Sequence, residues 1–149
     1  MLSSDMIFDE PLAKYTTFGI GGPARCMVYP ENRYELSTLL KYANKNNIPT
    51  IFIGSGSNLL VWDEGFDGIV ISLRKTFKQF IIKKNAQIIV ESGVMLGTIV
   101  KEAIRLQIGG LESLIGVPGT LGGALIMNAG AFGSEISTYF KEAKTMTLE

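Results

Sequence analysis

The stretch TIFIGSGSN, Thr50 to Asn58, joins a short apolar run to a loop in which no side chain is larger than asparagine. Residues 50–53 follow Pro49 and form a continuous apolar run, which predicts a buried β-strand. The loop that follows exposes its backbone, and exposed N–H groups in a nest-like turn bind anions. Small side chains let a phosphate approach those groups closely. The sequence therefore predicts a phosphate-binding loop made of Gly54, Ser55, Gly56, Ser57 and Asn58.

A second glycine-dense stretch, GVPGTLGGALIMNAGAFG, covers residues 116–133. Residues 120–128 are predicted to form a short helix, in which Gly122 and Gly123 each cost roughly 1 kcal/mol relative to alanine. Pro118 suits the first turn of a helix, and Gly119 would give a ligand access to the free N–H groups there. This pattern indicates an anion site without basic side chains. The structural alternative is that the two helix glycines permit close packing.

Better-known phosphate motifs do not fit the first loop. A Rossmann fingerprint needs a third glycine where this chain has Leu59, and an acidic residue near positions occupied by Arg74 and Lys75. The Gly-Lys-Ser/Thr sequence of a Walker loop is absent. The structural alternative is a tight turn that ends a strand. Taken together, the two glycine segments predict an elongated ligand that carries phosphate.

The composition excludes several classes of function. With 149 residues and 46% hydrophobic content, the chain can bury one core or form two small lobes. Fourteen basic and 14 acidic residues give a net charge of zero, which argues against a nucleic-acid partner. Histidine is absent, so histidine-based triads and most imidazole metal sites are excluded within this chain. Any chemistry is expected to come from a cofactor or from another chain segment.

No segment suggests export or insertion into a membrane. The start of the chain lacks the basic and apolar pattern of a signal peptide, and no apolar run approaches the roughly 18 residues that span a bilayer. We expect a soluble cytoplasmic protein without a membrane partner. The single cysteine, Cys26, lies in an apolar strand and is predicted to be a core residue. Asp63, Glu64 and Asp67 are predicted to form a solvated turn, so no metal site is expected.

Hydrophobic periodicity predicts the remaining elements. Residues 24–29 form a predicted strand, followed by an amphipathic helix with Leu36, Leu39, Leu40 and Ala43 on one face. With the strand at 50–53 this makes a strand-helix-strand unit, for which a parallel pair is expected. The other predictions are a strand at 69–73, a hairpin of residues 79–83 and 87–91, a helix from Leu96 to Ile104 that stops at Gly109, and a strand at 143–148. The last strand runs into the chain end, which indicates a truncated protein.

Three motifs, TTFGIGGPA (16–24), IGSGSNLLVWDEGFDGIVI (53–71) and GLESLIGVPGTLGGALIMNAGAFGSEI (110–136), resemble one known family in order and spacing. That family is the UDP-N-acetylenolpyruvoylglucosamine reductases, flavoproteins of bacterial peptidoglycan synthesis. The resemblance covers the N-terminal half of the family. It implies an α/β (α+β) FAD-binding domain of the vanillyl-alcohol-oxidase type at residues 1–149. A largely parallel lobe would cover residues 1–75, and a lobe with an antiparallel sheet would cover residues 76–149.

The resemblance also implies a set of cofactor-binding residues. Residues 53–59 would hold the FAD pyrophosphate, residues 115–123 would face the pyrophosphate and flavin, and residues 128–131 would lie near the isoalloxazine ring. The implied residues are Ile53, Gly54, Ser55, Gly56, Ser57, Asn58, Leu59, Ile115, Val117, Pro118, Gly119, Thr120, Gly122, Gly123, Asn128, Ala129, Gly130 and Ala131. Phe132 stands where the family usually has tyrosine.

The reaction implied by the resemblance is the NADPH-dependent reduction of the enolpyruvyl group of a UDP-sugar to UDP-N-acetylmuramate. The family's catalytic serine, arginine and glutamate and its UDP-sugar-binding domain correspond to chain beyond Glu149. We therefore predict no catalytic residue in this chain and no turnover by it alone. Two alternatives stay open: the FAD module of a related oxidase or dehydrogenase, and a non-catalytic nucleotide-binding module. The oligomeric state is also left open.

Overall fold

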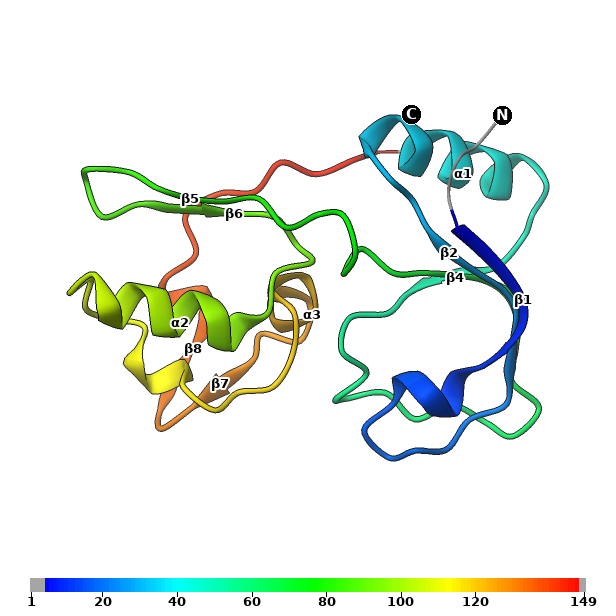
Figure 1. Ribbon diagram of the computed structural model, residues 1–149, viewed down its shortest axis with the longest axis horizontal. Coiled ribbons are helices and arrows are strands. Elements are labelled where there is room, and N and C mark those ends of the chain that lie inside the picture. The colour runs from blue at the N-terminus through cyan, green and yellow to red at the C-terminus, as the bar shows by residue number, and fades with distance from the viewer. Residues whose placement is uncertain (1–4, 148–149) are drawn as a thin grey trace. The chain divides into compact units, whose positions relative to one another are not determined.

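The computed structural model describes residues 5–147, which fall into two compact units (Figure 1). The first unit comprises the described residues up to Thr76 together with those from Lys144 onward, and the second is Phe77–Ala143. Each unit has its own hydrophobic core. The predicted boundary between the lobes, after residue 75, lies one residue before the division in the structure. The prediction assigns the residues from 144 onward to the second lobe, whereas the structure groups them with the first unit.

The first unit contains a four-stranded sheet in the order β1-β2-β4-β3. Strands β2 (Pro23–Tyr29), β4 (Phe66–Ile71) and β3 (Thr50–Phe52) are parallel, and β1 (Asp5–Pro11) is antiparallel to β2. The predicted strands are present, although β4 begins three residues earlier than expected. The strands on either side of the first helix are β2 and β3, and they are parallel. The prediction that they pair directly is wrong, because β4 lies between them.

The helix between β2 and β3 is α1 (Arg33–Lys45). It begins at Asn32, whose side-chain oxygen accepts a hydrogen bond from the Glu35 amide at 3.0 Å and satisfies one of the free N–H groups of the first turn. The predicted apolar face is confirmed by the burial of Leu36, Leu39 and Ala43. These contacts fix the course of the chain into β3 and the loop that follows it.

The core of the first unit lies against one face of the sheet. Met27 and Tyr29 of β2 alternate with side chains of the opposite face, as the two-residue period of a strand requires. The short 3₁₀ helix η1 (Leu12–Tyr15) adds Leu12, which is fully buried. The remaining members are Ala24, Ile53, Val61 and Val70.

The second unit begins with the predicted hairpin, now β5 (Phe80–Ile82) and β6 (Ile88–Val90), which are antiparallel. Helix α2 (Leu96–Arg105) follows, and its predicted apolar face is confirmed by the burial of Leu96, Ile99, Val100 and Ala103. The helix stops earlier than the predicted Gly109. Gln107 adopts the left-handed conformation with φ of 56° and ends the helix in place of the glycine.

The rest of the second unit consists of short elements: η2 (Glu112–Leu114), α3 (Leu121–Ile126), β7 (Gly130–Ala131), β8 (Ser134–Glu135) and η3 (Ile136–Thr138). The antiparallel pair β7–β8 is a second two-stranded sheet. The predicted final strand is wrong for residues 143–147, which have no regular structure, and Leu148 lies outside the described residues. A mixed, mainly parallel sheet in one unit and antiparallel pairs in the other confirm the predicted fold class.

Candidate functional site

The predicted phosphate loop, residues 53–59, begins where β3 ends. The Ile53 N–H donates to the Ile71 carbonyl at 2.9 Å, so the pairing with β4 continues one residue beyond β3. The Ile53 side chain is 4% exposed and belongs to the core, and Leu59 packs against the same core. These two apolar side chains hold the ends of the loop, which leaves residues 54–58 as the part that presents polar groups.

The backbone amides of the loop are its main hydrogen-bond donors. In the described part of the chain, the N–H groups of Gly54, Ser55, Gly56 and Asn58 donate to no protein acceptor. The Ser55 Oγ donates to the Ser57 Oγ at 3.2 Å, so the two hydroxyls are adjacent. Because no lysine or arginine occurs in residues 54–58, an anion bound here would be stabilised by backbone dipoles and neutral side chains. This part of the predicted anion site is chemically suited to a phosphate.

Gly56 has a structural role that the sequence did not indicate. Its φ is 69°, and a Cβ added to it would overlap the Tyr15 carbonyl oxygen and lie 2.8 Å from the Tyr15 carbonyl carbon. The Thr17 N–H also donates to the Gly56 carbonyl at 3.1 Å. The space at the Gly56 α-carbon is therefore occupied by protein backbone. A larger residue at this position would disturb the fold before it could block a phosphate.

The second predicted anion site, the N-terminus of α3, needs correction. The Leu121 N–H donates to the Val94 carbonyl at 2.8 Å, and the Gly122 N–H donates to the Ser92 carbonyl at 2.9 Å. The Gly123 N–H donates to the side chain of Thr120, which caps the helix. All three amides of the first turn are thus occupied by the protein itself, so they are not free for a ligand as predicted.

The two helix glycines differ in their surroundings. A Cβ on Gly122 would lie 3.0 Å from the Ser92 Cβ and 3.2 Å from the Ser92 carbonyl oxygen, so this position is close-packed. A Cβ on Gly123 would meet only the Thr120 Oγ1 at 3.5 Å, an ordinary contact. The structural alternative raised by the sequence, close packing, therefore applies to Gly122. Gly123 has no such steric requirement.

The segment that leads into α3 is exposed at its start and buried at Gly119 and Thr120, next to the helix. Thr120 is 3% exposed and Val117 packs against the core of the second unit. The Gly119 carbonyl accepts a hydrogen bond from the Leu96 amide at 2.9 Å, and so caps the start of α2, which lacks the side-chain cap that is usual there. Ile115, 47% exposed, and Pro118 are the predicted binding residues of this segment whose side chains remain accessible.

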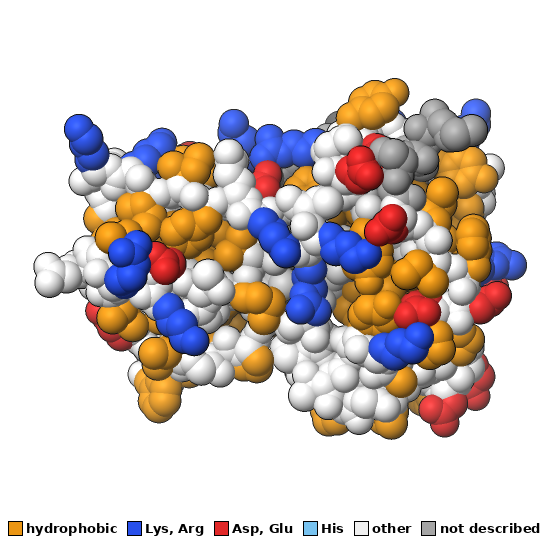
Figure 2. All heavy atoms as spheres, in the orientation of Figure 1, with side chains coloured by type: hydrophobic (Ala, Val, Ile, Leu, Met, Phe, Trp, Pro, Cys, Tyr) orange, Lys and Arg blue, Asp and Glu red, His pale blue; other side chains and the backbone are white. Residues whose placement is uncertain are grey.

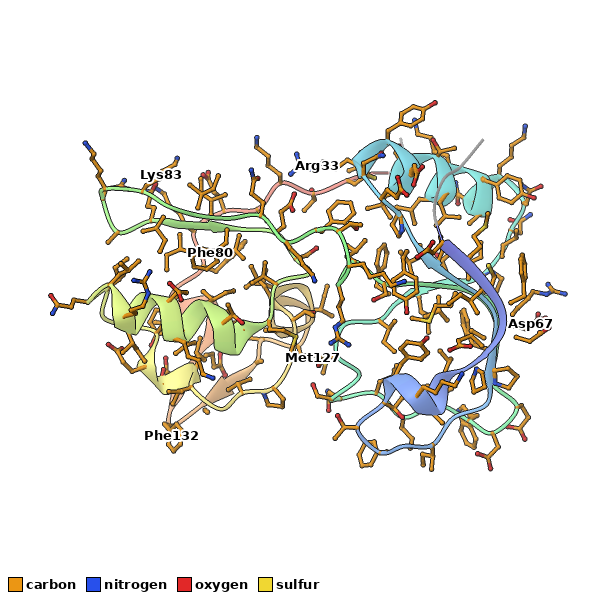
Figure 3. All side chains as sticks on the ribbon, viewed as in Figure 1. Arg33, Asp67, Phe80, Lys83, Met127 and Phe132 are labelled. Carbon is orange, nitrogen blue, oxygen red and sulfur yellow. The ribbon has the colours of Figure 1, made fainter. Side chains whose placement is uncertain are left out.

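The predicted residues 128–131 form the entry to the β7–β8 hairpin. Asn128 has φ of 44°; its side-chain amide donates to the Glu135 Oε2 at 2.6 Å, and its Oδ1 accepts from the Ser137 amide at 3.2 Å. The Asn128 side chain thus holds the hairpin together. The turn itself is Phe132–Gly133, with φ of 52° and 80°, and Phe132 points away from the unit with 86% of its surface exposed (Figure 3).

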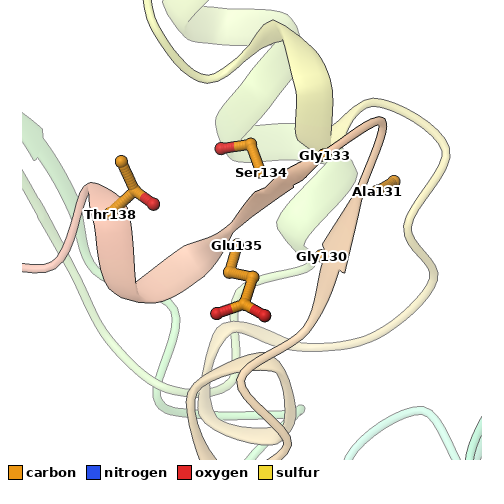
Figure 4. Close-up of a pocket in the computed structure, with 6 residues that line it drawn as sticks. All are labelled: Gly130, Ala131, Gly133, Ser134, Glu135 and Thr138. Atoms are coloured by element: carbon orange, nitrogen blue, oxygen red, sulfur yellow. The ribbon is translucent and has the colours of Figure 1, made fainter.

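A shallow pocket of about 510 Å³ lies beside this hairpin (Figure 4). Near it, the Tyr139 hydroxyl is 2.7 Å from the Ser134 Oγ and 3.1 Å from the Ser113 Oγ. The hydrogen bonds to Ser113 and then Ser134 lower the pKa of Tyr139 below its usual value. Of the predicted binding residues, two contribute to the pocket, which is lined by Gly130, Ala131, Gly133, Ser134, Glu135 and Thr138.

Two tyrosines of the candidate site could not be identified from sequence patterns. Tyr15 contacts the phosphate loop from a distant part of the chain, and Tyr139 joins two serines that are 21 positions apart. Neither tyrosine belongs to a glycine-rich motif or to a period of apolar residues. A local pattern could therefore not signal either contact.

Other expected features are reported for the described residues. Cys26 is buried, and burial raises the pKa of its thiol, as suits a core residue. Asp67 of the acidic cluster pairs with Arg25 at 3.1 Å on the surface, and no group of potential metal ligands occurs among residues 5–147. Charged side chains of both signs lie on the face shown in Figure 2. None of the helices described is long and apolar enough to span a membrane.

Comparison with known proteins gives consistent results. Residues 24–148 match the sequence family described as FAD binding domain. The UDP-N-acetylenolpyruvoylglucosamine reductase of Streptococcus thermophilus is 42% identical over 149 residues, which is 100% of this chain and 48% of that protein. The chain thus spans about half the length of the curated relatives it matches.

Two solved structures are similar to this fold. The crystal structure of UDP-N-acetylenolpyruvylglucosamine reductase from Thermus caldophilus has a TM-score of 0.68 and 34% identity, covering 92% of this chain and 46% of that one. A solvent-stable cholesterol oxidase has a TM-score of 0.64 at 12% identity, covering 86% of this chain and 25% of that one. At that identity the second similarity concerns the fold alone.

Proposed function

The chain belongs to the family of FAD-binding domains, and on that basis we propose that it forms the flavin-binding part of a UDP-N-acetylenolpyruvoylglucosamine reductase. The observation that carries the proposal is the loop of residues 54–58, whose amides at Gly54, Ser55, Gly56 and Asn58 have no protein acceptor within the described chain. Uncommitted amides in a bare loop suit the FAD pyrophosphate, because they approach its oxygens without a basic side chain.

In this proposal, residues 53–59 bind the pyrophosphate mainly through backbone N–H groups and the Ser57 and Asn58 side chains. Residues 115–123 of the second unit contribute through their accessible groups, Ile115 and Pro118, and not through the amides at the start of α3, which are occupied. Residues 128–131 contribute near the isoalloxazine ring, where Gly130 and Ala131 line the pocket and Asn128 holds the hairpin.

The proposed activity belongs to the whole protein. Bound flavin supplies hydride transfer from NADPH to the enolpyruvyl double bond of the UDP-sugar. The role of this chain is to bind and orient the cofactor, whereas proton delivery and UDP-sugar binding are assigned to the part of the relatives that this chain does not cover. The product, UDP-N-acetylmuramate, places the proposed protein in cytoplasmic peptidoglycan synthesis, and so in cell-wall growth, cell shape and division.

The pyrophosphate assignment can be tested by a change of charge at the loop. Asn58 is exposed, so Asn58→Asp is expected to fold while adding a carboxylate beside the bound phosphates. Repulsion between this carboxylate and the neighbouring phosphates should weaken FAD binding by about tenfold or more. FAD titration of the two proteins, followed by flavin fluorescence, measures the effect.

Asn47→Asp is the matched control. Asn47 is also exposed, lies in the same unit, and precedes β3 whereas the loop follows that strand. Its φ of 52° is a conformation that aspartate also tolerates. FAD affinity should be unchanged in this variant. Equal affinities of Asn58→Asp and Asn47→Asp would refute the assignment of residues 54–58 to the pyrophosphate.

A further inference from the structure

The loop of residues 54–58, called the phosphate loop below, packs against the backbone of residues 15–17. The Gly56 α-carbon is so close to the Tyr15 carbonyl that no Cβ fits between them, and the Thr17 N–H donates to the Gly56 carbonyl at 3.1 Å. Gly56 is the central residue of the loop, so its position sets where the neighbouring amides point. Any displacement of Tyr15 and Thr17 would therefore be passed to the groups proposed to bind phosphate.

The backbone that supports the loop is held differently at its two ends. At the start of η1, the Leu12 and Ala13 amides donate to the Gly22 and Gly21 carbonyls at 3.0 and 3.1 Å. This helix has only four residues and no side-chain cap at its N-terminus, so it depends on tertiary contacts. Its last residue, Tyr15, is held by its side chain, which packs against the core of the first unit.

The Tyr15 hydroxyl donates to the Glu10 Oε1 at 2.7 Å. The Glu10 side chain is only 12% exposed, and its other partner is the Lys14 ammonium at 3.2 Å, whose side chain is 62% exposed. A hydroxyl that donates to a carboxylate makes one of the stronger hydrogen bonds in proteins. The phenol is thus attached to β1, and the backbone of the same residue supports the loop.

We propose that Tyr15 is a positioning residue for the phosphate loop: its phenol, held by Glu10, fixes the backbone against which Gly56 packs. Tyr15 touches the loop through its main chain and acts on a ligand only through the loop. The consequence for FAD rests on the function proposed above, whereas the effect on the loop does not.

The first test measures, by hydrogen exchange, how firmly the loop is held against residues 15–17 in the ligand-free chain. Hydrogen exchange of the Thr17 amide reports directly on its bond to Gly56, and exchange of the Ile69 amide, which donates to the Pro49 carbonyl at 2.8 Å, reports on the sheet. Loss of a hydrogen bond to a charged group should accelerate exchange at Thr17 by about tenfold in Tyr15→Phe. Exchange at Ile69 should stay within about twofold of the wild-type rate, because local opening spares the rest of the unit.

Lys14→Met is the matched control, since it removes the other partner of Glu10 and leaves the Tyr15 hydroxyl in place. Both exchange rates should stay at their wild-type values in this variant. Equal acceleration at Thr17 and Ile69 in Tyr15→Phe would mean a general loss of stability, and no acceleration at Thr17 would mean that the phenol does not hold the loop. Either result overturns the proposal.

The second test is FAD titration of the same proteins. Tyr15→Phe should weaken FAD binding by about fivefold, less than the full effect of one charge-assisted hydrogen bond because Tyr15 acts only through the loop, and Lys14→Met should not weaken it. If the wild-type chain binds no FAD, the proposed function fails, and the exchange rates still decide whether Tyr15 positions the loop. If Thr17 exchange accelerates but FAD affinity is unchanged, Tyr15 holds the loop without positioning it for the cofactor, which overturns the proposed consequence for FAD.

Discussion

Glu10 and Tyr15 each alter the acid–base chemistry of the other through their shared hydrogen bond. The hydrogen bond from Tyr15 is the main cause that lowers the pKa of Glu10 below its usual 4.5, and Lys14 acts in the same direction. Burial, followed by hydrogen bonds with Tyr29 and Glu10, raises the pKa of Tyr15. The two shifts have the same consequence, because they keep the carboxylate charged and the phenol protonated across the physiological range.

The lowered pKa of Glu10 predicts how stability depends on pH. A carboxyl group whose pKa is lower in the folded than in the unfolded protein stabilises the fold above its unfolded pKa, and that contribution is lost as the pH falls through the folded pKa. We expect Glu10→Gln to be less stable than wild type at neutral pH, with a difference that shrinks as the pH drops below 4.5. Urea unfolding of both proteins at a series of pH values measures this, and a difference that does not change with pH would contradict it.

Gly56 and Gly19 form a matched pair for testing the contact with Tyr15. Their φ values are 69° and 68°, but a Cβ on Gly19 meets nothing within 4 Å, whereas a Cβ on Gly56 meets the Tyr15 backbone. Gly19→Ala should therefore cost only the conformational strain of about 1 kcal/mol. Gly56→Ala should lower the free energy of unfolding by about 2 kcal/mol more, because backbone must move. Thermal unfolding of the two variants compares them, and equal losses would show that the contact is relaxed in solution.

At the scale of elements, α3 differs from its prediction because its partners are distant in the sequence. A helix that starts with Thr-Leu-Gly-Gly predicts free amides in its first turn, but Ser92 and Val94, which precede α2, supply carbonyls to two of them. No pattern within residues 116–133 could indicate this. Strand β1 was not predicted for a similar reason, since nearly all of its residues are exposed and only pairing with β2 defines it.

The elements with local signals were predicted well. The apolar spacing of α1 and the polar turn of the β5–β6 hairpin act within a few residues of the structure they specify. The loop after β3 was identified in the same way, because small residues directly after a strand are a local feature. Its support by Tyr15 was not, since that contact joins residues 41 positions apart.

Gly122 and Gly123 of α3 should respond differently to alanine, because only Gly122 is close-packed. Gly123→Ala should raise the free energy of unfolding by about 1 kcal/mol, because alanine favours the helix and the added Cβ makes an ordinary contact. Gly122→Ala should gain less or lose stability, because its Cβ would press on Ser92. Denaturant unfolding of both single variants tests the difference. Equal gains would mean that the Ser92 contact does not restrict position 122.

For the whole molecule, family membership and the two-unit architecture agree with a flavin-binding role. The mixed sheet of the first unit supports the phosphate loop, and the second unit carries the segments 115–123 and 128–131 that the family resemblance assigns to FAD. Because the net charge is zero and residues 54–58 include no basic residue, the proposed FAD binding depends on backbone amides and not on a positive field. Affinity for the cofactor should accordingly depend only weakly on salt.

Calorimetric titration of the purified chain with FAD and, in parallel, with riboflavin, which has the same ring but no pyrophosphate, tests whether the chain binds flavin through the pyrophosphate. We predict saturable binding of one FAD per chain, and riboflavin binding weaker by about a hundredfold or more, because residues 54–58 then have no phosphate group to bind. Absence of FAD binding, or equal affinity for FAD and riboflavin, would contradict this prediction.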